Sequence, residues 1–274
     1  MGKIIVYLLL IGVSVLSLFP FLWMVINSFN SSANIFTVTP QLIPDLFLRP
    51  GMFINYVRVL TEFNFGRYTL NSFIVAGASA AGQVFTCTLA GFAFALMKFP
   101  GKNLIFSLIL ATMMIPIQVT IIPEFLLMMR LQWLDTYAPL IIPSILIGSF
   151  GTFMFKEFFE GMPKSFVDAG TIDGAGAGAM YLLIFLPQSN SQIATFFIIA
   201  FMNNWNDLLR PILYITTERL QTVTMALTQF QSQYSAQWNL LLTGGVLSIV
   251  PLLIIYLFLQ KYIIEGIAST GTKG

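Results

Sequence analysis

Histidine is absent from the 274 residues of this chain, and cysteine occurs only once, at Cys87. Without histidine the chain lacks the side chain that most often serves as a general base or metal ligand, so the sequence predicts no metal site and argues against a membrane-embedded enzyme. A single cysteine also excludes an intrachain disulfide. Because Cys87 lies within an apolar run, we expect it to be a small buried hydrophobe.

Charged residues are scarce as well: they make up 9% of the chain, with a net charge of +2 and an isoelectric point near 8.7. No dense cluster of Lys and Arg occurs, so the sequence implies neither nucleic acid nor a strongly anionic lipid patch as a partner. Hydrophobic residues make up 57%, and the mean hydropathy is +0.84. Such values predict an integral membrane protein.

A phosphate-binding loop of the pattern Gly, four residues, Gly-Lys, Ser or Thr is also missing. The Gly101-Lys102 pair lacks the earlier glycine and is followed by Asn103. We therefore expect that the chain does not itself hydrolyse ATP.

Apolar runs long enough to cross a bilayer are plentiful. A hydrocarbon core about 30 Å thick needs roughly 20 mostly apolar residues, and a helix satisfies its own backbone where water is missing. The sequence therefore predicts an all-α integral membrane protein with six transmembrane helices, at residues 4–28, 70–96, 104–128, 138–156, 182–209 and 239–260. The first run is long for a signal peptide and no small-x-small cleavage site follows it, so we interpret it as a transmembrane helix. The loop charges divide too evenly to decide the orientation.

Two loops between the predicted spans have distinctive compositions. The loop after the first span is rich in Pro, Asn and aromatic residues, and we interpret it as an interfacial segment with one short amphipathic helix near Asn55–Leu60. The loop Pro211–Trp238 has a polar and aromatic stretch that fits either an interfacial anchor or a surface for a partner. Its candidate partner contacts are Gln231, Gln233, Tyr234, Gln237 and Trp238.

The stretch PKSFVDAGTIDGAGAGAMYLLIFLP, residues 163–187, interrupts the apolar pattern with two aspartates and a run of small residues. Pro163 suits the first turn of a helix and Gly174 its end, where a left-handed residue often closes the last turn, so we predict a short helix at 163–173. It spans only about 16 Å and lies outside the membrane, between the fourth and fifth spans. The small residues fit either a flexible loop or a surface that another backbone approaches closely.

Within that stretch, FVDAGTIDGAGAGAMYLLIFLP resembles the loop motif of permease subunits in binding-protein-dependent ABC importers: Glu-Ala-Ala, three residues, Gly, nine residues, Ile, x, Leu, Pro. The matching positions are Asp168, Ala169, Gly170, Asp173, Gly174, Ala175 and Pro187. The similarity is closest to carbohydrate-type permeases, such as the second membrane subunit of the maltose importer, and extends in order along nearly the whole chain. It includes the stretches FPFLWMVINSF, NYVRVL, LAGFAFALMKFPGKN, NNWNDLLRPILYI and LQKYIIEGIASTGTKG.

The resemblance implies that residues 163–175 form a cytoplasmic coupling helix that docks on an ATPase subunit, with both termini in the cytoplasm. It also implies three kinds of partner: a second homologous permease, two ATP-binding subunits that hold ATP and Mg, and an extracytoplasmic solute-binding protein. The complex would lie in a bacterial-type inner membrane. The substrate would be a sugar: a di- or oligosaccharide, a glycoside or a polyol. We expect residues 1–69 to form the first helix and an extracytoplasmic segment, 70–262 the permease core, and 263–274 a cytoplasmic tail.

The polar C-terminal tail fits either a frayed end or, as the resemblance suggests, a segment inserted between the ATPase subunits. In the second case its contact residues are Thr270, Gly271, Lys273 and Gly274.

Polar side chains in the predicted third and fifth spans suit a sugar, whose hydroxyls and flat C–H faces match amides and aromatic rings. These substrate-path candidates are Gln118, Thr120, Asn203, Asn204, Trp205, Asn206 and Asp207. Each also fits hydrogen bonding between helices. The alternative function is a proton- or sodium-coupled secondary sugar carrier, but ionisable groups within the spans are scarce, so the sequence favours the importer.

The chain departs from the family pattern at several positions. Asp168 and Gly170 replace Glu and Ala, so we expect a weaker or differently shaped docking contact. The run Gln188–Ser191 stands where a further proline is usual after Pro187, and Arg210 stands where an aromatic residue is usual. The exit of the fifth span is therefore unusually cationic.

Overall fold

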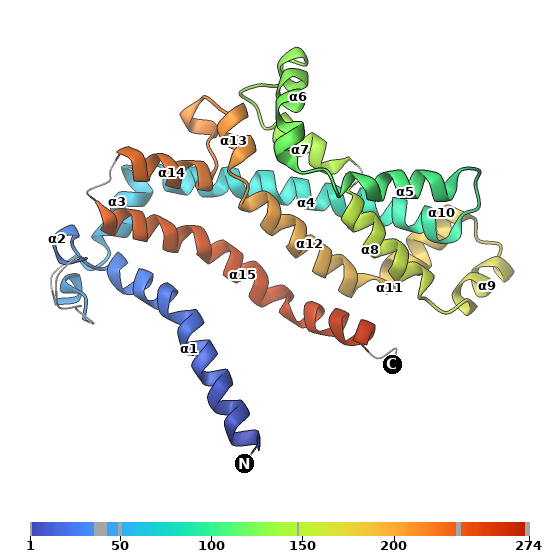
Figure 1. The fold of residues 1–274 in the computed structure, drawn as a ribbon, viewed down its shortest axis with the longest axis horizontal. Helices are drawn as coiled ribbons and strands as arrows, with labels where there is room; N and C mark the ends of the chain where they lie inside the picture. Colours follow the sequence, from blue (N-terminus) through green and yellow to red (C-terminus); the bar gives the residue numbers. More distant parts are fainter. Residues whose placement is uncertain (1, 36–42, 49–50, 147, 234–236, 272–274) are drawn as a thin grey trace. The chain divides into compact units, whose positions relative to one another are not determined.

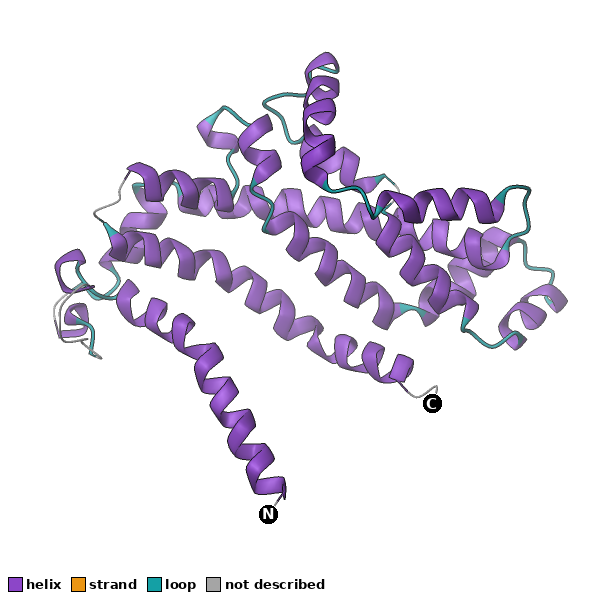
Figure 2. Ribbon diagram, viewed as in Figure 1, coloured by secondary structure: helices purple, strands orange, loops and turns teal. Residues whose placement is uncertain are grey.

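The computed structural model describes residues 2–35, 43–48, 51–146, 148–233 and 237–271. Within these ranges all regular secondary structure is helical, with turns and loops between the helices (Figure 2). The predicted helical class is therefore confirmed for this part of the chain. The chain divides into two compact units, Met1–Leu70 with Thr222–Leu253, and Asn71–Gln221 with Ile254–Gly274.

Four of the described helical segments are long and apolar enough to cross a membrane. They are α1 (Gly2–Ser28), α4 (Phe65–Leu96), the run Ala138–Glu160 that holds α7 (Ala138–Ile145) and α8 (Ser149–Glu160), and Trp238–Tyr262 within α15 (Trp238–Gly271). Two further candidates are bent pairs: α5 (Lys102–Thr112) with α6 (Ile117–Arg130), bent by 99°, and Ala177–Gln188 with α12 (Asn190–Trp205), bent by 79°. With each pair counted as one span, the described chain has six candidate spans, the number that the sequence predicts.

The sequence predicts the third and fifth spans as single helices, whereas both are bent. Pro116, the residue before α6, has an extended backbone with ψ of 139° and no amide hydrogen, so α5 does not continue through it. Ser189 separates α11 (Leu186–Gln188) from α12, and Pro187 removes a helical hydrogen bond at the same place. Ser189 Oγ donates to the Leu186 carbonyl at 2.8 Å, which satisfies one group exposed by the break.

In the first unit, buried amides satisfy the carbonyls at the end of α1. Asn55 Nδ2 on α3 (Ile54–Thr61) donates to the carbonyls of Ser28 at 2.7 Å and Asn30 at 3.0 Å. Asn239 Nδ2 on α15 donates to Asn55 Oδ1 at 2.9 Å. These bonds join α1, α3 and the start of α15, because carbonyls at a helix end need partners from outside the helix.

The remaining described elements of the first unit are α2 (Ser32–Ile35), the 3-10 helix η1 (Asp45–Leu48) and α14 (Val223–Gln233). The helix α3 confirms the short helix predicted near Asn55–Leu60. Helix α1 buries none of its most apolar window within the chain, so lipid or another subunit must cover it.

In the second unit, buried aromatic rings form the core between α4, α8 and the π-helix η2 (Met180–Phe185). The ring of Phe92 on α4 lies 5.4 Å from that of Phe185 and 6.2 Å from that of Phe159, both nearly edge-on. The Tyr181 hydroxyl forms a hydrogen bond of 2.8 Å with Thr88 Oγ1. These contacts fix η2 against α4 and α8.

Glycines allow α8 to lie close to α4. A Cβ on Gly91 would stand 2.6 Å from the Phe155 Cβ, and one on Gly151 would stand 2.7 Å from Cys87 Sγ. Glycines that let a neighbouring helix approach this closely are typical of helices packed in a membrane. Cys87 is buried, with Sγ 3.3 Å from the Gly148 carbonyl, which confirms the expectation of a small buried side chain.

Helix α8 also contacts α5 and α12, and α13 (Leu209–Tyr214) packs on α7 (Figure 1). The other described elements of this unit are α9 (Ser165–Ile172), α10 (Ala177–Ala179) and η3 (Glu218–Leu220).

Candidate functional site

The predicted coupling segment forms α9, Ser165–Ile172, which lies outside every candidate span. The sequence predicts a helix at 163–173, and the observed helix begins two residues later. Pro163 and Lys164 form the preceding turn, in which the Phe166 amide donates to the Pro163 carbonyl at 3.1 Å. Gly174 has φ of +69°, the left-handed conformation predicted for the closing residue.

Two backbone hydrogen bonds close the C-terminal end of α9. The Gly174 amide donates to the Thr171 carbonyl at 3.1 Å, and the Ala175 amide donates to the Gly170 carbonyl at 2.8 Å. This is the Schellman pattern, in which a left-handed residue lets the chain satisfy the last helical carbonyls. Asp173 and Ala175 therefore have roles in the local geometry around Gly174.

Helix α9 has one protein-facing side and one solvent-facing side. Gly170 is buried against η2, where Met180 and Ile184 are its nearest neighbours. Asp168 and Ala169 are exposed on the other side. Ile172 is 85% exposed, the highest value among the large apolar side chains that the structure describes.

The glycines after α9 stand in open space within the described chain. A Cβ on Gly174, Gly176 or Gly178 would meet no atom within 4 Å. The sequence left open whether another part of the chain lies close to these small residues. Among the glycines from 170 to 178, only Gly170 has such a close neighbour. Pro187 is exposed on α11.

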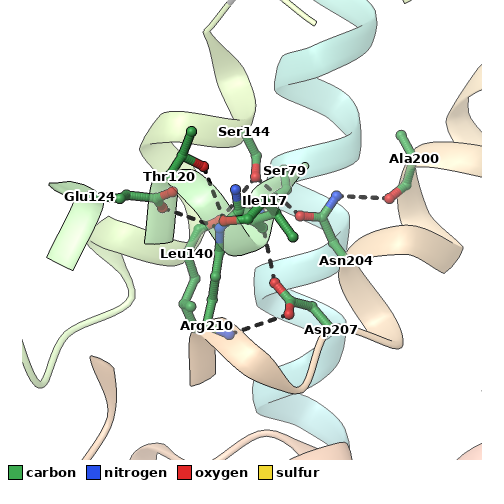
Figure 3. A network of polar contacts seen from close by, with 10 residues as sticks. All are labelled: Ser79, Ile117, Thr120, Glu124, Leu140, Ser144, Ala200, Asn204, Asp207 and Arg210. Carbon is green, nitrogen blue, oxygen red and sulfur yellow. Dashed lines mark hydrogen bonds and ion pairs between the residues drawn. The ribbon is translucent and has the colours of Figure 1, made fainter. Parts of the chain in front are cut away.

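A second polar site lies where α6 meets the turn between α12 and α13 (Figure 3). Arg210 Nε donates to Glu124 Oε1 at 3.1 Å, and Arg210 Nη1 lies 3.7 Å from Asp207 Oδ2. The side chains of Glu124, Asp207 and Arg210 are 16%, 21% and 25% exposed. Sequence reasoning singled out Asp207 and Arg210 but missed Glu124. The available signal was an acid inside an apolar span, which requires a partner.

Asn204 joins α12 to α7 beside this cluster (Figure 3). Its Nδ2 donates to the Ala200 carbonyl at 2.7 Å, and its Oδ1 accepts from Ser144 Oγ at 3.2 Å. For Asn204, the hydrogen bond between helices considered from the sequence is thus present.

The other substrate-path candidates divide by exposure. Gln118, Thr120, Asn203 and Asn206 are exposed. Trp205 is 2% exposed, and its ring stacks 5.5 Å from that of Phe201, so it packs in the core in this conformation. Their part in substrate passage stays a prediction.

Asp135, which sequence reasoning missed, holds two loops together near α13. Its Oδ1 accepts from the amides of Thr216 at 3.0 Å and Thr217 at 2.8 Å, and its Oδ2 accepts from Thr217 Oγ1. The Thr217 hydroxyl and these amides lower the pKa of Asp135 to about 2. Asp135 has φ of +58°, and the one available signal was that Asp tolerates this conformation in turns.

Some predicted contacts lie outside the described residues. These are Tyr234, Lys273 and Gly274, together with the side chains of Gln231, Gln233 and Thr270. The backbone at Thr270 and Gly271 belongs to α15. Trp238 begins α15 and is exposed, and Gln237 precedes it.

A family model described as the inner membrane component of binding-protein-dependent transport systems matches residues 87–269. The chain belongs to this family. It is 30% identical over 100% of its length, and 98% of the relative's, to the arabinooligosaccharides transport system permease protein AraQ of Halalkalibacterium halodurans. It is also 30% identical, over 96% of this chain and 94% of the relative, to the sn-glycerol-3-phosphate transport system permease protein UgpE of Yersinia pestis.

A solved structure of a bacterial ABC transporter involved in the import of the acidic polysaccharide alginate has the same fold. The TM-score is 0.80, with 21% identity and 96% of both chains covered. The predicted resemblance and membrane fold are therefore confirmed. The chain is a multi-pass inner-membrane permease subunit without a cofactor of its own, and it is not itself an ATPase. Its family implies an ATPase, a binding protein and a partner permease, which excludes the secondary carrier considered from the sequence.

Proposed function

We propose that this permease, with a second homologous permease, forms the path by which a di- or oligosaccharide, a glycoside or a polyol enters the cell. Two ATP-binding subunits drive the cycle through residues 163–175, which include α9. The observation that carries the proposal is the exposed Ile172 on a helix outside the candidate spans. Because α9 lies outside the candidate spans, we infer that a protein surface is the partner of this side chain.

The contacts of α9 suit it to transmit a movement. Its end is fixed by the Schellman bonds at Gly174, and its buried face rests on η2 through Gly170. The chain then continues from η2 through α11 into α12, at whose end Asn203, Asn206 and Asp207 lie. A displacement of α9 by the ATPase therefore acts on the element that carries path candidates, which is the coupling that alternating access requires.

The choice of a sugar rests on two observations. The exposed path candidates carry three amides and one hydroxyl, which match the donors and acceptors of a polyol. AraQ of Halalkalibacterium halodurans, named for arabinooligosaccharides, is similar to this chain over its full length.

The same proposal fixes the orientation of the chain in the membrane. With α9 at the ATPase, both termini and the tail 263–274 lie in the cytoplasm, where Thr270, Gly271, Lys273 and Gly274 are candidate ATPase contacts. The loop that carries Gln231, Gln233, Tyr234, Gln237 and Trp238 then faces the binding protein on the opposite side. Residues 1–69 supply the first helix and extracytoplasmic segment, and residues 70–262 the permease core.

Co-purification tests the proposal. The tagged chain is purified from its native membranes in mild detergent, and hydrolysis of ATP is measured with the binding protein and a panel of sugars. We expect a second permease and an ATP-binding subunit in the complex, with hydrolysis stimulated by loaded binding protein. A single polypeptide that moves a solute in liposomes without ATP would overturn it.

A further inference from the structure

The acid Glu124 lies in the middle of α6, inside a candidate span. A charge in the hydrocarbon region is costly unless it faces protein or a water-filled cavity. At 16% exposure Glu124 is largely enclosed, and its carboxylate is paired with Arg210. The pair therefore faces the interior of the assembly or a wet surface, and not lipid.

The cluster holds more negative than positive charge. Arg210 is shared between the carboxylates of Glu124 and Asp207, at 3.1 Å and 3.7 Å, so the three side chains carry a net charge of −1 (Figure 3). The guanidinium is already engaged by two carboxylates and is poorly placed to receive an anion from the path. Replacement of the usual aromatic residue by Arg210 thus does not create an anion site.

The neighbourhood responds to this negative charge. Tyr214 on α13 is buried, and its ring stacks on Phe125, the residue after Glu124, at 6.2 Å between centroids. Burial raises the pKa of the Tyr214 hydroxyl, and the Glu124 carboxylate raises it further. Tyr214 therefore stays neutral and leaves the net charge of the cluster unchanged.

Path candidates adjoin the cluster. Asn206 precedes Asp207 and is exposed. Asn204 lies three residues before Asp207, near the end of α12, and Figure 3 shows it beside the cluster. A solute that reaches Asn206 enters the field of the cluster, and half-buried charges are screened less by salt than exposed ones. Uncharged sugar hydroxyls can donate to carboxylates, whereas a phosphate or carboxylate on the solute is repelled.

We propose that the Glu124–Arg210–Asp207 cluster makes the substrate path selective for uncharged polyhydroxylated solutes over anionic ones. This inference rests on the proposed function, because it assigns the cluster to the path. It names the charge class of the substrate, which the relatives leave open: one is named for arabinooligosaccharides, which are uncharged, and one for sn-glycerol-3-phosphate, which is an anion.

Charged thiol reagents measure the field directly. Asn206→Cys is made in a Cys87→Ser background, and the assembled complex is treated with cationic and anionic methanethiosulfonates. We expect the cationic reagent to react about tenfold faster than the anionic one. The ratio of the cationic to the anionic rate should fall at least threefold after Glu124→Gln or Asp207→Asn. A cysteine at Asn103, exposed at the start of α5 and outside residues 163–175, is the matched control, and its ratio of cationic to anionic rates should not change with either variant.

Two results would overturn the inference. One is a ratio at position 206 that is near one and unaffected by Glu124→Gln. The other is a cysteine at 206 that neither reagent modifies, which would place this surface outside the path.

A transport measurement separates this inference from the proposed function. Uptake of a neutral trisaccharide is compared with its uronate analogue in complexes with and without Glu124→Gln. The inference predicts that the variant lowers the neutral-to-anionic ratio about tenfold. Equal ratios in both complexes contradict the inference alone, whereas ATP-independent uptake contradicts the proposed function.

Discussion

Gly170 on α9 lies so close to Ile184 on η2 that a Cβ at position 170 would stand 3.0 Å from the Ile184 Cδ1. The glycine at a position where the family usually has alanine therefore allows close packing, and not simply a looser helix. Gly170→Val should destabilise the protein by about 1–3 kcal/mol through overpacking. Thermal unfolding in detergent measures the change.

A double-mutant comparison with Gly170→Ala isolates this contact. Ile184→Val removes the Cδ1 atom, so the cost of Gly170→Ala should be smaller in the Ile184→Val background. If the alanine costs the same in both backgrounds, α9 does not rest on η2 through these atoms.

Gly174 supplies a backbone conformation that other residues adopt at a cost. With φ of +69° and open space around it, Gly174→Val should strain the cap by about 1–2 kcal/mol without a clash. We expect normal membrane insertion, loss of most uptake and weaker association with the ATPase. Gly178→Ala, a glycine in open space without positive φ, is the control and should keep uptake. Full uptake by Gly174→Val would remove the cap from the coupling mechanism.

Arg210 neutralises carboxylates that the fold encloses. Arg210→Met should lower stability by about 2–4 kcal/mol, because Glu124 and Asp207 then share a half-buried site without a cation. Adding Glu124→Gln should recover part of the loss, as measured by thermal unfolding of the purified complex. If stability does not recover, Arg210 stabilises the fold through packing of the aliphatic part of its side chain.

Asp135 makes the stability depend on acid pH. Its folded pKa of about 2 lies below its ordinary value of 3.8, so the carboxylate stabilises the fold above about pH 4 and this contribution is lost as the pH falls toward 2. Asp135→Asn should lower the unfolding temperature at pH 7 and have progressively less effect below pH 4. The exposed Asp168→Asn serves as a control. If Asp135→Asn lowers the unfolding temperature by the same amount at pH 7 and pH 3, the lowered pKa of Asp135 is refuted.

Local signals predicted the parts of the molecule that depend on local physics. Long apolar runs predicted the spans, and a proline and a glycine predicted a short helix closed by Gly174. The bends at Pro116 and Ser189 were missed because a helix break inside an apolar run does not change its hydropathy.

Partners distant in sequence could not be predicted. Glu124 and Arg210 are 86 residues apart, and Asp135 and Thr217 are 82 apart. From the sequence, Trp205 was a candidate either for the substrate path or for contacts between helices, and in this conformation its ring packs on Phe201. Such placements depend on how whole helices pack.

If α9 couples this permease to an ATPase, Ile172→Asp should break the contact between them. The variant places a charge on the 85% exposed apolar side chain, while Ser165→Asp adds the same charge at the exposed beginning of the same helix. We expect Ile172→Asp to insert normally but to retain at least tenfold less ATPase subunit on co-purification and to lose uptake, whereas Ser165→Asp keeps both. Undiminished recovery of the ATPase subunit and normal uptake with Ile172→Asp would show that α9 is not the coupling helix.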